Sequence, residues 1–85
     1  MIQMDVKNYW VKDMSKGTDE KGFRVEVFNN ANGLSQKLRY SVISESFNHL
    51  EGKRFSLPKY LQKAILERAK AFGWSTTYEE YCNED

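Results

Sequence analysis

A glycine-containing turn between two alternating segments constrains this chain more than any other feature. The apolar residues of the two segments alternate with polar ones, and they are Phe23, Val25 and Val27 before the turn and Leu38, Tyr40 and Val42 after it. Such alternation is typical of strands with one buried face. Between them lies Asn32-Gly33, the dipeptide that best tolerates the two positive φ angles of a type I′ turn. The segment therefore predicts an antiparallel hairpin.

A two-residue turn would also fix the register of this hairpin. The expected cross-strand pairs on the apolar face are Val27 with Leu38, Val25 with Tyr40, and Phe23 with Val42. On the other face Glu26 would lie opposite Arg39. Each pair joins residues of compatible chemistry.

A third strand is expected over residues 4–13, which contain Val6, Tyr9, Trp10 and Val11. The polar segment 15–22 would form the loop back to the hairpin. The three strands then form a meander with one apolar face that needs a cover.

An amphipathic helix over about 56–72 supplies that cover, with Ser56 as its cap and Gly73 after its last turn. The apolar positions that share one side of it are Leu57, Leu61, Ala64, Ile65 and Phe72. Arg68 falls on the same side. A short helix is expected over 44–52, and Thr77 with Glu80 has the spacing of a capping box. The predicted fold is α+β: a three-stranded antiparallel meander covered by one helix, with short helical turns beside it. It forms a single domain over 1–85 whose acidic C-terminus frays from about residue 82.

The overall charge gives little indication of a partner. The 85 residues carry 13 basic and 12 acidic side chains, a formal net charge of +1. Neither a leader nor a membrane-spanning segment is visible in the sequence, so we expect a cytoplasmic protein without a membrane partner. With one cysteine and one histidine, no spacing fits a metal site, and we expect neither metal nor cofactor.

Catalysis has little support in the residues. An enzyme would have to combine Cys82 with His49 from distant segments. We expect a non-enzymatic protein and keep this pair as the third hypothesis.

Charge is segregated along the chain in two ways that suggest binding. Lys59, Lys63 and Lys70 share a helix stripe with Leu66, and the polar sheet face carries Arg24, Phe28 and Arg39. Either surface would suit a nucleic acid. In contrast, all the charged residues after 75 are acidic, and the aromatic residues Trp74, Tyr78 and Tyr81 lie near them in the sequence.

Three stretches resemble small phage anti-CRISPR proteins that inhibit type II RNA-guided nucleases. They are Val25 with Asn29-Asn30 and Gly33, the run Tyr-Ser-Val-Ile-Ser-Glu-Ser at 40–46, and Gly73-Trp74 followed by Tyr78-Glu79. That family lays acidic surfaces on the DNA-binding site of the nuclease. The resemblance implies the same role for Glu45, Glu79, Glu80, Glu84 and Asp85. This chain departs from the family in its near-neutral charge.

The favoured hypothesis is a phage or mobile-element inhibitor of a host defence nuclease. Its partner-binding residues would be the acidic set above with Leu66, Trp74, Tyr78 and Tyr81. The alternative is a small nucleic-acid-binding protein. It would use Lys59, Lys63, Lys70, Arg24, Phe28 and Arg39.

Overall fold

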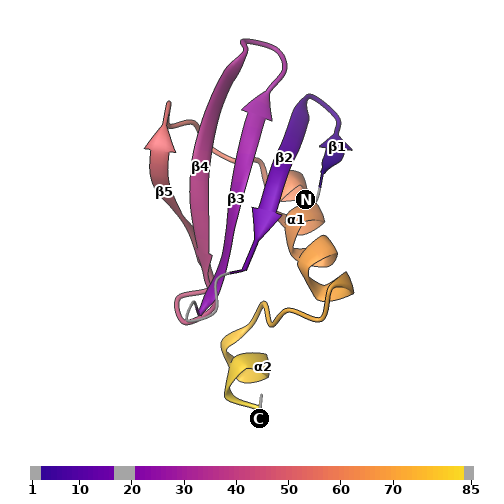
Figure 1. The fold of residues 1–85 in the computed structure, drawn as a ribbon, viewed down its shortest axis with the longest axis vertical. Helices are drawn as coiled ribbons and strands as arrows, with labels where there is room; N and C mark the ends of the chain where they lie inside the picture. The colour runs from indigo at the N-terminus through magenta and orange to yellow at the C-terminus, as the bar shows by residue number, and fades with distance from the viewer. Residues whose placement is uncertain (1–2, 17–20, 84–85) are drawn as a thin grey trace.

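The chain forms one antiparallel sheet and two helices in the computed structural model, which describes residues 3–16 and 21–83. The strands are β1 (Met4–Val6), β2 (Tyr9–Ser15), β3 (Gly22–Asn29), β4 (Leu34–Ser41) and β5 (Ser46–Gly52), and the helices are α1 (Lys59–Ala71) and α2 (Tyr78–Cys82). Each strand pairs with the next in chain order, so the sheet is a meander (Figure 1). The α+β class is confirmed, but the sheet has five strands rather than three.

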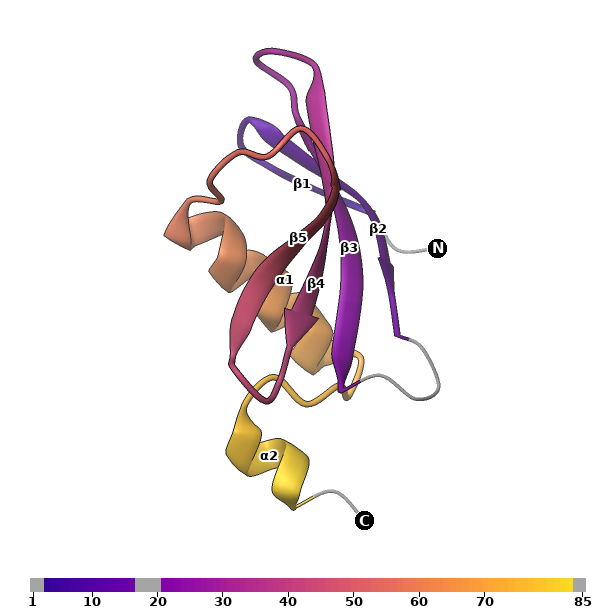
Figure 2. The ribbon, with the colours of Figure 1, turned by 90° about the vertical axis from the view of Figure 1, so that its left-hand side faces the viewer.

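The elements form two layers. Helix α1 crosses one face of the sheet, and no other described element covers the opposite face (Figures 1 and 2). Helix α2 lies beyond the end of the sheet, near the turn that joins β4 to β5. The uncovered face and the end that carries α2 are therefore the surfaces where binding residues can gather.

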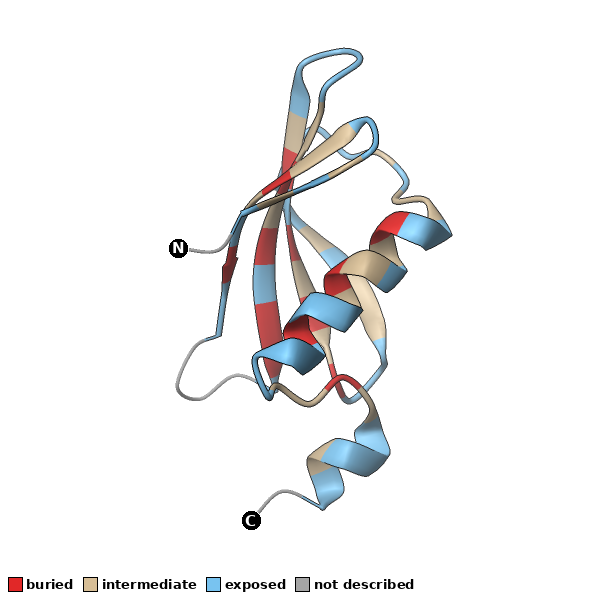
Figure 3. Cartoon of the chain, turned by 90° about the vertical axis from the view of Figure 1, so that its right-hand side faces the viewer, coloured by how far each residue is buried: buried red, intermediate tan, exposed pale blue. Residues whose placement is uncertain are grey.

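The core lies between α1 and the covered face of the sheet (Figure 3). Its buried apolar side chains include all six that the hairpin alternation predicted, Phe23, Val25, Val27, Leu38, Tyr40 and Val42. The other members are Val11, Met14, Leu61, Ile65 and Ala69. The period of the sequence thus assigned the hairpin residues to the correct face.

The register of the hairpin differs from the prediction by two residues. Val27 lies opposite Gln36, Val25 opposite Leu38, and Phe23 opposite Tyr40. The loop has four residues, 30–33, because the amide of Gly33 donates to the carbonyl of Asn29 at 2.8 Å. The side chains of Asn29 and Asn32 also accept bonds from the amides of Ala31 and Leu34. A shift of two leaves every side chain on its face, so alternation alone could not detect it.

On the uncovered face the shift changes which charges meet. Arg24 lies opposite Arg39, and Glu26 lies opposite Lys37. The predicted pair of Glu26 with Arg39 is wrong for this reason.

The strand predicted over 4–13 is two strands. Val6 lies opposite Tyr9, and Lys7 and Asn8 make the turn between them. A further irregularity between Val11 and Asp13 inserts Lys12 as a bulge. The turn and the bulge explain why the alternation of this segment was blurred.

The helix predicted over 44–52 is wrong, because most of this segment is β5. Phe47 pairs with Tyr40, and His49 pairs with Leu38, so both extend the covered face. Leu50 is the extra residue of a bulge and is exposed. The apolar residues Phe47 and Leu50, three apart in sequence, therefore belong to a bulged strand and not to a helical turn.

Helix α1 begins later than expected and turns a different stripe to the core. Its N-cap is Pro58, which has no capping side chain, so the cap predicted at Ser56 is wrong. Leu61, Ile65 and Ala69 are buried along it, whereas Leu57 and Ala64 are half-buried and Phe72 is exposed. Arg68 is exposed, so its charge stays in water.

Both predicted end signals in the last third of the chain are confirmed. Gly73 has φ +84°, and the amides of Gly73 and Trp74 donate to the carbonyls of Lys70 and Ala69, a Schellman arrangement that ends α1. Thr77 and Glu80 form the capping box of α2. The fraying predicted from about residue 82 is not seen at Cys82, the last residue of α2, or at Asn83, its cap, and the rest of that segment, 84–85, lies outside the described residues.

Gly33 provides a stability test of the hairpin loop. It has φ +72°, and a Cβ added there would meet no atom within 4 Å, so a substitution changes backbone strain alone. We expect Gly33→Val to lower the free energy of unfolding by about 1–2 kcal/mol, measured by urea denaturation. Gly33→Asn is the matched control, because asparagine tolerates positive φ and should cost much less. Equal losses in both variants would contradict this account.

Candidate functional site

Helix α2 and the β4–β5 turn bring acidic residues from distant segments together. Glu45 lies in that turn, and its Oε2 accepts a hydrogen bond from the backbone amide of Tyr78 at 3.1 Å. Glu79 and Glu80 follow in the first turn of α2. Four of the predicted partner-binding residues therefore form one surface at the end of the sheet, here called the α2 surface: Glu45, Tyr78, Glu79 and Glu80.

Glu45 occupies an uncommon backbone conformation. Its φ is 52°, a left-handed value that costs a residue with a Cβ about 1–2 kcal/mol. Its carboxylate satisfies an amide at the start of α2, where negative charge is favoured. The strained turn thus places Glu45 against the helix.

A buried tyrosine holds the segment before α2. The hydroxyl of Tyr40 donates to the carbonyl oxygen of Thr76. Burial first, then the charges of Glu45 and Glu80, raise the pKa of Tyr40, so it remains a neutral donor. This bond ties the α2 surface to the core of the sheet.

Glu80 is used in the structure of the helix. Its Oε1 lies 3.2 Å from the amide of Thr76 and 3.1 Å from the amide and hydroxyl of Thr77. Bonds from the Thr76 amide, then from the Thr77 and Thr76 hydroxyls, lower the pKa of the Glu80 carboxyl, and Lys70 adds to the effect. Glu79 is exposed and Tyr78 keeps 50% of its surface exposed, so these two are the most available to a partner.

The other aromatic residues predicted to bind a partner are packed on the core. The Trp74 ring is 5.5 Å from Phe23 and 5.3 Å from Phe72, so Trp74 packs onto the core. Tyr81 is half-buried against that core. Glu84 and Asp85 lie outside the described residues.

The lysine stripe is on α1, as the helical wheel predicted. Lys59, Lys63 and Lys70 are exposed and line a shallow groove of about 440 Å³ together with Leu66 and Glu67. Leu66 is half-buried and packs against the core, which explains its place among the lysines.

The uncovered sheet face holds the other nucleic-acid candidates. Phe28 lies 5.3 Å from Trp10, centroid to centroid, and the Nζ of Lys12 is 5.5 Å from the Phe28 ring. Lys12 also approaches Glu26 at 4.0 Å, and Lys37 approaches Glu51 at 3.8 Å. Carboxylates thus neutralise part of this face. Sequence reasoning missed Trp10 as the partner of Phe28, because the bulge at Lys12 obscured the period of β2.

The structure places His49 and Cys82 in different environments. The Nδ1 of His49 is 3.0 Å from Oε1 of Gln36 on the covered face of the sheet. Cys82 is exposed on α2, and a hydrogen bond with its thiol is the first cause of the raised pKa of Tyr78. Within residues 3–16 and 21–83, no three His, Cys, Asp or Glu side chains are grouped as a metal site requires. No helix in those ranges is long and apolar enough to cross a membrane.

Comparison of the chain with known proteins gives no family assignment. No protein-family model matches it, and the searches of curated proteins and of solved structures found no significant match. Its function therefore has to be inferred from its own surfaces.

Protonation of Glu80 should release α2 at low pH. Folding lowers the pKa of this carboxyl from its ordinary value of 4.5, so the folded protein binds the proton less readily than the unfolded chain. The stabilisation is complete above about pH 4.5 and is lost as the pH falls through the folded pKa. We expect the backbone amide NMR shifts of Tyr78–Cys82 to move toward unfolded values in that range. The transition should persist in Glu79→Gln and disappear in Glu80→Gln; an unchanged transition in Glu80→Gln would assign it to another group.

Proposed function

We propose that this protein is a non-enzymatic inhibitor that binds a host defence protein in the host cytoplasm. The α2 surface would cover a basic nucleic-acid-binding site on that partner, an RNA-guided nuclease. The observation that supports this proposal is the bond between Glu45 and the amide of Tyr78, which joins residues 33 positions apart into one acidic surface.

The chemistry of the α2 surface suits a cationic partner. Nucleic-acid-binding sites are lined with lysine and arginine, and carboxylates complement them. Glu79 projects into solvent, and the half-exposed ring of Tyr78 offers an apolar anchor next to it. Because Tyr40 and Glu45 fix this surface to the sheet, little ordering would be needed on binding. The resemblance to anti-CRISPR proteins, given above, supports the choice of a type II nuclease as the partner.

The proposal is tested by inhibition of DNA cleavage. The purified chain is added to type II nucleases loaded with guide RNA, and cleavage of a matched target is measured before and after target addition. We expect inhibition when the chain is added first. Glu79→Lys should slow association about 3- to 10-fold in a surface plasmon resonance experiment, because charge complementarity acts mainly on the on-rate.

The matched control is Glu67→Lys, which makes the same charge change on an exposed residue of α1. Glu67→Lys should retain the wild-type association rate. Equal effects of the two variants would mean that the association rate depends on the net charge of the whole protein and not on the α2 surface. A lack of inhibition across the nucleases would exclude this class of partner.

Nucleic-acid binding is the second candidate function, favoured by the contact of the Trp10 and Phe28 rings beside Lys12 on the uncovered sheet face. Aromatic rings on which bases can stack bind single strands together with cations, although Trp10 and Phe28 are both half-buried. Against it, the two ion pairs on that face leave fewer cations for phosphates.

Fluorescence anisotropy with short DNA and RNA oligonucleotides separates the two functions. The inhibitor proposal expects little binding at physiological salt. If binding is tight and falls steeply with salt, Arg39→Gln and Lys63→Gln identify the surface, since a lost phosphate contact lowers the salt slope by about one. A reduced slope in Arg39→Gln alone would assign the ligand to the sheet face.

A further inference from the structure

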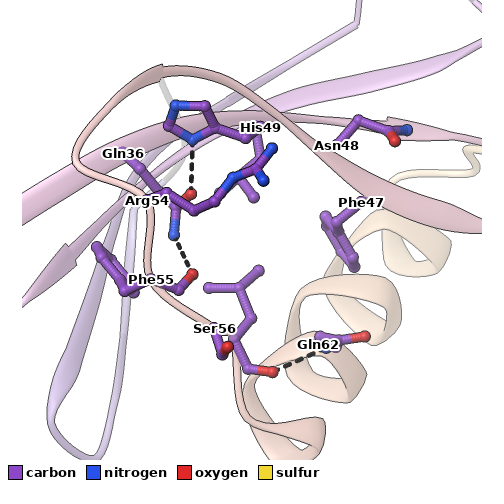
Figure 4. Close-up of a pocket in the computed structure, with 10 residues that line it drawn as sticks. Gln36, Phe47, Asn48, His49, Arg54, Phe55, Ser56 and Gln62 are labelled. Carbon is purple, nitrogen blue, oxygen red and sulfur yellow. Dashed lines mark hydrogen bonds between the residues drawn. The ribbon is translucent and has the colours of Figure 1, made fainter.

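A groove lies between β5 and the start of α1, at a place that no sequence motif indicated (Figure 4). Its volume is about 470 Å³. The residues that line it come from β4, β5, the segment 53–58 and α1, and they are Gln36, Leu38, Phe47, Asn48, His49, Arg54, Phe55, Ser56, Leu57 and Gln62.

The groove lies on the helix side of β5, which is the edge strand of the sheet. Three consecutive residues of this strand, 47–49, line it. Phe47 and His49 face the helix side of the sheet, so a strand added beside β5 would turn alternate side chains toward the groove. In the described part of the chain β5 pairs with β4 alone. Its outer backbone N–H and C=O groups therefore have no strand partner and can accept one.

The charge of the groove is one-sided. Among the described residues that line it, Arg54 is the only permanently charged one, and none is Asp or Glu. Arg54 is exposed and makes no hydrogen bond, ion pair or ring contact with any described residue. The half-buried side chains of Phe47, Phe55 and Leu57 provide an apolar wall nearby. A ligand that fits this groove carries a carboxylate and an apolar group.

Hydrogen bonds fix the wall that carries Arg54. Nε2 of Gln36, a residue with 1% of its surface exposed, donates to the carbonyl oxygen of Phe55 at 2.6 Å. The carbonyl of Phe55 can only accept, so the amino group of the Gln36 amide must face it and Oε1 of Gln36 must face Nδ1 of His49. Because Oε1 is an acceptor, Nδ1 of His49 carries the proton. Gln62 donates to the carbonyl of Leu57 at 2.8 Å and holds the other end of the segment. The groove is thus formed before any ligand binds.

We propose that an extended acidic segment of a partner protein adds to β5 as a sixth strand. Backbone bonds to the outer edge of β5 hold the segment, as in other cases of strand addition. Its Asp or Glu side chain pairs with Arg54, and an apolar side chain two residues away, on the same face of the strand, packs on Phe47 and Phe55. This site is separate from the α2 surface and does not depend on the proposed nuclease.

The probe is a pair of short synthetic peptides with alternating threonines, in which Phe and Glu stand two residues apart; the second peptide has Lys in place of Glu. Titration into the ¹⁵N-labelled protein should shift the amides of 46–52 and of Arg54, with the Glu peptide bound about tenfold more tightly than the Lys peptide. Arg54→Glu should reverse that preference. The matched control, Arg68→Glu, changes an exposed arginine outside the groove and should keep the wild-type preference.

Methylated peptides test the strand pairing without altering the protein. In an added strand, alternate N–H groups face β5 and the others face solvent. Methylation of one alternating set of peptide nitrogens should abolish binding, and methylation of the other set should leave it intact. Equal tolerance of both sets, equal affinity for the Glu and Lys peptides, or shifts confined to α2 or the uncovered sheet face would overturn the proposal. None of these readouts involves nuclease inhibition, so the two proposals fail separately.

Discussion

The burial of Phe23 is the interaction on which the rest of the structure depends. The side chain is fully buried, and its ring lies 5.2 Å from Tyr40, 5.5 Å from Trp74 and 6.4 Å from Phe47, centroid to centroid. These rings come from β4, from the segment after α1 and from β5. One side chain of β3 therefore joins the sheet to the end of the chain. Truncation of an aromatic ring in such a core typically costs about 3–5 kcal/mol.

The aromatic cluster also positions the candidate sites. Tyr40 belongs to it and holds Thr76, so α2 is attached to the sheet where Glu45 can cap it. At the other end of the same covered face, the buried amide of Gln36 holds the segment that carries Arg54. The near-zero net charge of the sequence conceals this arrangement, because carboxylates gather at α2 while the groove beside β5 has a single arginine and no acid. Partner choice depends on such local charges more than on the total.

Some features could be predicted from the sequence because they depend on neighbouring residues. Alternation assigned Phe23 and Val25 to the buried face, and the capping box of Thr77 with Glu80 was found from its spacing. The strand β5 could not, because the apolar spacing of Phe47 and Leu50 suits a helical turn as well as a bulged strand. The decision came from the edge of β4, which needed hydrogen-bonding partners.

The sequence by itself determined which residues of the hairpin are buried, where α1 ends and how α2 is capped, because each depends on short-range periodicity or on a local hydrogen bond. Alternation did not fix the register of β3 against β4, since a shift of two residues preserves both faces and the register rests on the four-residue loop that Asn29 and Gly33 close. Only the tertiary structure decided that residues 46–52 form the edge strand β5. It likewise decided that Glu45 meets α2 and that Arg54 stands beside the edge of β5. The contact of Glu45 with α2 joins residues 33 positions apart, so no local pattern encodes it.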